Sequence, residues 1–167
     1  MFPNIFPPPP SDQIDWDSPA SVGASHVQVN GYVETRYQAS KGQWTEPRLI
    51  ENPSVAASAP WPSSSSHAET MIALRHVTPW GDKLVVFRPD FHAARMARSA
   101  AATAPPPPPA LFTECVRRAV SANAEFVPPA ESDGVLSIRA VLTSCSYGEA
   151  GEEDAVLTHC WWLPKTA

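Results

Sequence analysis

The sequence has few charged side chains and no long apolar run. Only 17% of its 167 residues are charged, and the formal net charge is −5. The cations are scattered, so no basic field is present that would attract nucleic acid or an anionic membrane. No stretch approaches the roughly 18 consecutive apolar residues of a membrane-spanning helix, and the start lacks the charged and apolar regions of a targeting signal. We therefore expect a cytoplasmic protein with neither a nucleic-acid nor a membrane partner.

Cysteine and histidine are also too sparse and scattered to indicate a metal centre. Cys115, Cys145 and Cys160 are irregularly spaced and form no CxxC motif, and the five histidines are equally dispersed. Ligands of structural metal sites are normally paired locally, and an odd number of cysteines does not suggest a disulfide framework. We expect reduced thiols and no metal site.

Proline, in contrast, is abundant and clustered. Eleven of the 20 prolines lie at residues 6–10, 60–62 and 105–109, where they favour polyproline II spacers or loops. The first 25 residues are rich in proline, serine and aspartate, which predicts a poorly ordered N-terminal segment over 1–25. Ile14 and Trp16 are the two side chains of this segment suited to dock on the domain, which we expect to span 26–167.

Alternation, turn residues and helical spacing predict the elements of this domain. The segment 26–47 reads as strand, turn, strand, turn, and the serine-rich segment 52–69 as a loop. Strands are expected over 70–77 and 83–88 as a hairpin, and again over 135–144 and 155–163. One helix begins at Pro89 and buries a stripe made of Ala93, Met96, Ala97 and Ala100. A second, over 110–126, buries Phe112, Cys115, Val116, Ala119 and Val120.

The order of these elements indicates the fold class. The two helices follow one another, whereas in a doubly wound sheet they would alternate with the strands. We therefore predict a single α+β domain with a mostly antiparallel sheet and two main helices packed on it.

Several stretches resemble the branched-chain amino-acid aminotransferases, which are fold-type-IV enzymes dependent on pyridoxal phosphate, and their fungal members in particular. The matching stretches are "IDWD" (14–17), "NGYVETRYQASKGQWTEPRLIENP" (30–53), "VVFRPDFHAARMARSA" (85–100), "LFTECVRRAVSANAEFVPP" (111–129) and "LSIRAVL" (136–142). They occur in family order. Of these, the stretch 85–100 is the most specific.

The resemblance covers residues 13–145 and implies the smaller, N-terminal domain of that family. There, the lysine that binds the cofactor and most of the phosphate site lie in a larger C-terminal domain, to which nothing here corresponds. The resemblance therefore implies a truncated protein, a pseudoenzyme with no cofactor expected, although pyridoxal phosphate serves the family. Three lysines are present, Lys41, Lys83 and Lys165. None is in a context that suggests covalent catalysis.

The resemblance also implies roles for single residues. Arg95 matches the arginine that contacts the cofactor phosphate, although a surface role without a ligand is an alternative. Arg139 matches an arginine near the substrate pocket, but Ser137 stands where a tyrosine is expected. In the family's next substrate-side motif Glu69 and Met71 are retained. The two aromatic positions, the glycine and the lysine of that motif are Ser63, Ala68, Thr70 and Ile72.

Three functional hypotheses follow. The first is a non-catalytic domain that associates with itself, as a homo-oligomer such as a dimer, or with an intact aminotransferase. The second is a cofactor-independent enzyme or small-molecule-binding protein of a secondary-metabolite pathway, with a pocket lined by Arg139, Ser137, Glu69 and His67. His67, Glu69 and His92 are also candidates for acid/base chemistry. The third is a gene remnant without a function of its own.

Overall fold

The computed structural model of the chain describes residues 6–18, 29–51, 64–102, 104–132, 134–147 and 152–162. The elements follow in the order β1 (Tyr32–Gln38), η1 (Ala39–Lys41), β2 (Gln43–Trp44), β3 (Arg48–Ile50), β4 (Ser64–Thr78), β5 (Gly81–Val86), α2 (Pro89–Ala100), α3 (Pro109–Ala122), η2 (Ala124–Phe126), β6 (Leu136–Tyr147) and β7 (Glu152–Trp162). The predicted fold class, a single α+β domain, is confirmed.

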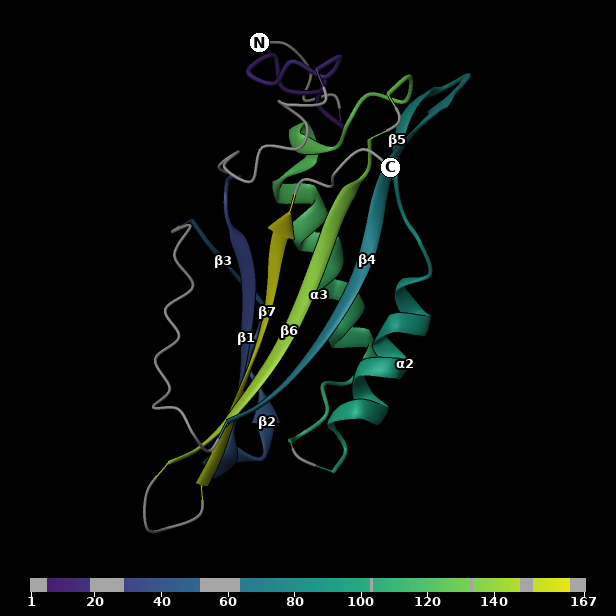
Figure 1. Cartoon of the computed structure of the whole chain (residues 1–167). Helices are drawn as coiled ribbons and strands as arrows, with labels where there is room; N and C mark the ends of the chain where they lie inside the picture. Colours follow the sequence, from purple (N-terminus) through teal and green to yellow (C-terminus); the bar gives the residue numbers. More distant parts are fainter. Residues whose placement is uncertain are drawn as a thin grey trace.

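The strands form one antiparallel sheet in the order β2-β1-β7-β6-β4-β5, and β3 pairs with β1 away from this path. The C-terminal hairpin of β6 and β7 lies between β1 and β4 and pairs with both. Figure 1 shows the long strands β4, β6 and β7 side by side, with α3 behind them and α2 beside β4. The middle of the sheet therefore depends on contacts between segments far apart in the sequence.

Both helices pack on one face of the sheet. Their buried side chains join those of β4 and β6 in one core, made of Met71, Ala73, Ala93, Met96, Ala100, Ala104, Phe112, Val116, Val120, Val127, Leu136, Ile138, Ala140 and Leu142. The apolar stripe predicted for the second helix is confirmed in full, whereas in the first helix Ala97 is half-buried. The helical spacing of apolar residues thus identified the face that each helix buries.

The second helix is shorter than predicted. It ends at Ala122, and a separate turn, η2, follows at Ala124–Phe126. Between them Asn123 is fully buried, and its Nδ2 donates to the backbone oxygens of Gly31 at 3.1 Å and Ala119 at 3.0 Å. Its Oδ1 accepts a hydrogen bond from the backbone N–H of Asn30 at 2.9 Å. These bonds end the helix, because they join it to the segment before β1.

The loop prediction for the serine-rich segment is wrong over its last part. Strand β4 begins at Ser64, and its first residues pair with the end of β6, from Ser64 opposite Cys145 to Glu69 opposite Ala140. The interval left between the last two predicted strands, 145–154, is likewise shorter, since β6 and β7 remain paired from Ser137 to Tyr147. Pairing with a neighbouring strand satisfies the backbone and overrides the local preference of serine for loops.

Two further predictions concern the ends of the domain. The boundary at residues 25 and 26 stays a prediction because residues 19–28 lie outside the described part, as does most of the strand expected before Asn30. Within 6–18, the backbone N–H of Ser11 donates to the oxygen of Glu125 at 2.8 Å, and Ile14 is buried. Among the described residues, no helix has the length and apolarity that crossing a bilayer requires.

Candidate functional site

A buried carboxylate, Glu69 of β4, lies under helix α2 and contacts two of its side chains. The Oε1 of Glu69 is 2.8 Å from the Nε of Arg95, and its Oε2 is 3.1 Å from the Nδ1 of His92. His92 and Arg95 are three residues apart, a spacing that puts both on one face of a helix. The site therefore joins β4, the neighbour of the edge strand β5, to the first turns of α2.

The alternation of β4 explains why Glu69 points into the protein. Glu69 and Met71 are both 3% exposed and Ala73 is fully buried, so every second residue faces the helices. An ionised carboxylate in this position is costly to bury unless it is paired and hydrogen-bonded. Arg95 and His92 supply these partners.

Arg95, which the resemblance connects with a cofactor phosphate, is thus bound to a carboxylate through its Nε. Its side chain remains 55% exposed, in contrast with 4% for Glu69. A guanidinium has two further NH₂ groups beyond its Nε. Arg95 is therefore a surface cation whose orientation is fixed by its ion pair with the buried carboxylate of Glu69.

The other predicted pocket residues lie elsewhere. Thr70 is opposite Arg139 and Ile72 is opposite Ser137 in the pairing of β4 with β6. Directly opposed residues share a face, so Arg139 and Ser137 lie on the face away from the helices, where Arg139 is exposed. Glu69 lies on the helix-covered face, so the structure does not bring it together with these two residues. The side chain of His67 lies outside the described part.

The lysines are also separated from Arg95. Lys41 is exposed in η1, next to the edge of the sheet formed by β1 and β2. Lys83 is exposed on β5 opposite His76, on the face away from the helices. Lys165 lies outside the described residues. Lys41 therefore lies at the other edge of the sheet from the cluster of Glu69, His92 and Arg95, and Lys83 lies on the other face.

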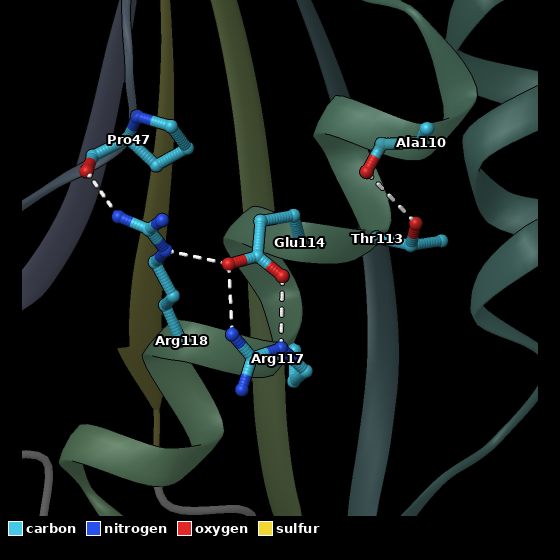
Figure 2. Close-up of polar contacts among 6 residues, drawn as sticks. All are labelled: Pro47, Ala110, Thr113, Glu114, Arg117 and Arg118. Atoms are coloured by element: carbon cyan, nitrogen blue, oxygen red, sulfur yellow. Dashed lines mark hydrogen bonds and ion pairs between the residues drawn. The ribbon is translucent and has the colours of Figure 1, made fainter.

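A second charged cluster, which sequence reasoning missed, is centred on Glu114 of α3 (Figure 2). Arg117 binds this carboxylate in a bidentate manner: its Nε donates to Oε2 of Glu114 and its Nη2 to Oε1, both at 2.8 Å. Arg118 donates from Nε to Oε1 at 2.6 Å and from Nη1 to the backbone oxygen of Pro47 at 2.8 Å. The cluster joins α3 to the segment between β2 and β3. Arg117 and Arg118 follow Glu114 by three and four residues, and this spacing in a predicted helix is the sequence feature that could have indicated the cluster.

The two arginines change the proton affinity of Glu114. Hydrogen bonds from Arg117 and Arg118 lower the pKa of the carboxyl from 4.5 to about 2. In the next position, burial raises the pKa of the Cys115 thiol to about 12. Neighbouring residues of one helix thus have opposite environments, because Glu114 faces outward and Cys115 faces the core.

Arg75 is a further cation whose role was not predicted from the sequence, and its side chain is only 3% exposed. Its Nη2 donates to the backbone oxygens of Pro8 at 2.9 Å and Ala124 at 3.2 Å, and its Nη1 is 3.4 Å from Asp82. Its Nε is buried without a partner among the described residues. Arg75 has the same strand parity as Glu69, so it too is directed to the helix side, where it holds the N-terminal segment.

The described residues also form two open grooves. One, of about 420 Å³, lies between β5 and α3 and is mostly apolar, with Leu84, Val86, Val116 and Val120 among its lining residues. The other, of about 650 Å³, is more polar and includes Asn30, Glu51 and Glu125. Neither groove includes Glu69, Arg95, Ser137 or Arg139.

Comparison with known proteins reveals relatives among fungal aminotransferases. The chain is 36% identical over 137 residues to "Aminotransferase poxL" of Penicillium oxalicum and 35% identical over 140 residues to "Transaminase htyB" of Aspergillus rugulosus. It is 38% identical over 138 residues to "Branched-chain amino acid aminotransferase gloG" of Glarea lozoyensis. No protein-family model matches the chain.

The similarity covers most of this chain but a minor part of each relative. It extends over 81%, 83% and 80% of the chain and over 36%, 36% and 37% of the three relatives. The chain therefore spans about a third of the length of the curated proteins that it matches. This coverage agrees with the resemblance to the small domain of the branched-chain aminotransferases.

Proposed function

We propose that this aminotransferase-like chain acts by association with another polypeptide, either a second copy or an intact aminotransferase, and does not catalyse transamination by itself. The observation that carries the proposal is the surface of the hairpin β4–β5 and the residue after it. Val77, Trp80, Val85 and Phe87 are exposed to 54%, 90%, 43% and 58% of their surface. Val85 and Phe87 lie on the face away from the helices and Val77 on the helix side, so this hairpin exposes large apolar side chains on both faces, which indicates a protein interface.

The described residues do not fit a pyridoxal phosphate site. That cofactor is held through a lysine amine, and it brings the electron sink that transamination needs. Lys41 and Lys83 lie apart from Arg95, and Arg95 itself is bound to Glu69. A phosphate at Arg95 would lie close to this carboxylate, whose negative charge would oppose it. We therefore expect no bound cofactor.

The alternative, a cofactor-independent enzyme or small-molecule-binding protein of secondary metabolism, has less support. It requires a pocket that contains Glu69, Ser137 and Arg139. These residues lie on opposite faces of the sheet. Association is therefore the function that we propose.

The experiment combines a measurement of mass with a test for the cofactor. Light scattering after size exclusion, at tens of micromolar protein, is expected to give a dimer or a larger species. Addition of pyridoxal phosphate followed by borohydride is expected to leave every lysine unmodified by mass mapping, with no turnover of leucine and 2-oxoglutarate. An intact branched-chain aminotransferase serves as the positive control for both chemical steps. A monomer that also fails to bind that aminotransferase, or a lysine adduct with turnover, would contradict the proposal.

A further inference from the structure

The two edges of the sheet differ in their capacity to bind another strand. At one edge β2 has two residues and β3 has three. At the other, β5 has six residues and pairs with β4 without a bulge, from Thr78 opposite Gly81 to Ala73 opposite Val86. In the described part of the chain β5 has no second neighbour in the sheet. A regular, unpaired strand of this length is a template for pairing with another chain.

The register shows which backbone groups of β5 point outward. The backbone N–H of Phe87 donates to the oxygen of Ile72 in β4 at 2.9 Å. In an antiparallel pair the backbone groups of alternate residues point to the same neighbour. Those of Val85 and Lys83 therefore also point to β4, whereas those of Asp82, Leu84 and Val86 point away from the sheet. This edge offers N–H and C=O groups from three alternate residues.

We propose that β5 pairs with β5 of a second copy of this chain, antiparallel and around a two-fold axis that passes between the two Val85 residues. This inference rests on the proposed function, because it assigns the surface and the partner of the association. In this arrangement Leu84 is opposite Val86 of the second copy, and Val86 opposite its Leu84. Each of these two residue pairs exchanges two backbone hydrogen bonds.

Charge complementarity selects this register. It places Lys83 of each copy opposite Phe87 of the other, whose ring can contact the lysine, and brings Asp82 close to Arg88, where the left-handed backbone ends the extended segment. Arg88 is exposed and its guanidinium carbon lies 4.6 Å from the centre of the Phe91 ring. A two-fold axis at Lys83 would put two lysines opposite each other, and an axis at Leu84 would place Asp82 opposite an apolar valine. The axis at Val85 avoids both.

The side chains of β5 also support a second copy as the occupant. Val85 is 43% exposed and Phe87 is 58% exposed, and both lie on the face away from the helices. On the helix side, Leu84 and Val86 line the groove between β5 and α3. Pairing of two identical edges brings the two grooves side by side. The contact thereby covers apolar surface on both faces of the sheet.

A cross-linking experiment tests the position of the axis. At a pair of residues that do not exchange hydrogen bonds, the Cα atoms lie about 4.5 Å apart, which a disulfide can span. Val85→Cys is therefore expected to give a disulfide between the two introduced thiols under mild oxidation, identified by peptide mass. Leu49→Cys is the matched control, because Leu49 is 44% exposed at the opposite edge. It is expected to give no such link.

A charge variant tests the same contact without oxidation. Arg88→Asp places two carboxylates together at each end of the pair, and we expect it to raise the dimer Kd about tenfold in sedimentation equilibrium. Arg88 has φ 48°, and an aspartate tolerates this left-handed conformation well, so the fold is retained. Arg88→Lys is expected to keep the dimer.

The outcomes separate this inference from the proposed function. Linkage at Val85 together with the weaker Arg88→Asp dimer supports β5 pairing. A dimer that shows no linkage at Val85 and no effect of Arg88→Asp overturns the pairing and leaves association in place. A chain that is monomeric at tens of micromolar overturns the pairing, and association then depends on binding to an intact aminotransferase.

Discussion

Glu69 and Arg95 form an ion pair of 2.8 Å between strand β4 and helix α2, although 25 residues separate them in the sequence. One partner is buried and the other is mainly exposed. The pair thus fixes a surface guanidinium through a charge inside the protein. This relationship accounts for a carboxylate beside the buried Met71 and Ala73 on the helix-covered face of β4.

Replacement of Glu69 by glutamine is expected to destabilise the fold. Glutamine retains the volume but loses the charge that binds Arg95 and His92. Because the carboxylate is buried and hydrogen-bonded, we expect a loss of about 1–3 kcal/mol in the free energy of unfolding, measured with urea. Glu46→Gln, at an exposed position, is the control and is expected to change stability by less than about 0.5 kcal/mol. Equal losses in the two variants would show that burial of the Glu69 charge has no special effect.

Much of the fold was predictable because it depends on local patterns. The stripe from Phe112 to Val120 recurs at helical spacing, and Pro89 marks the start of α2. The hairpin of β4 and β5 was indicated by two strand-like runs around Pro79, Trp80 and Gly81. Each of these features is decided by residues close together in the sequence.

The remainder depends on contacts between distant residues. The serines at the start of β4 are in a strand because β6 pairs with them, and nothing near Ser64 in the sequence indicates this partner. The burial of Glu69 and Arg75 could partly be predicted from the sequence, because both residues share the strand parity of the buried Met71 and Ala73. That parity predicts that both charges need partners under the helices. Which partners they find is decided by the packing of α2 and η2.

The ion pairs of Glu114 are expected to make stability depend on pH in the acid range. The pKa of the Glu114 carboxyl is about 2 in the folded chain and 4.5 without its arginine partners, as in the unfolded chain. As the pH falls, the unfolded chain therefore takes up the proton before the folded chain does. The contribution is therefore complete above pH 4.5 and is lost as the pH falls toward 2. We expect Glu114→Gln to be less stable than the wild type by about 0.5–1 kcal/mol at pH 7, with the difference vanishing near pH 2.

Urea unfolding of both proteins at several pH values measures this difference. Because the side chain of Glu114 is 32% exposed, added salt screens its pairs, and 1 M NaCl is expected to reduce the difference at pH 7. A difference that is constant from pH 7 to pH 2 would exclude the carboxylate charge as its cause.

The thiol of Cys115 is expected to resist alkylation in the folded protein. Burial raises its pKa to about 12, so at pH 8 almost no thiolate is present, and the sulfur is also out of contact with solvent. We expect iodoacetamide to modify Cys115 in urea but not in buffer, as measured by the mass of its peptide. Rapid modification in buffer would show that α3 leaves the sheet more readily than its packing indicates.

Arg75→Lys is expected to release the N-terminal segment while the sheet stays paired. Lysine keeps the charge, but its single ammonium cannot reproduce the planar geometry with which Arg75 reaches Pro8, Ala124 and Asp82. We expect a loss of about 2 kcal/mol in stability and faster hydrogen exchange at the amide of Ser11, which is bonded to Glu125. Amides of β6, measured by mass spectrometry in the same experiment, are the internal control and keep their relative protection. Arg36→Lys, at an arginine that is 56% exposed, is expected to leave Ser11 unchanged. If Ser11 exchanges at the same rate in the wild type and in Arg75→Lys, the N-terminal segment is held by Ile14 and its own turns, and the buried guanidinium has another role.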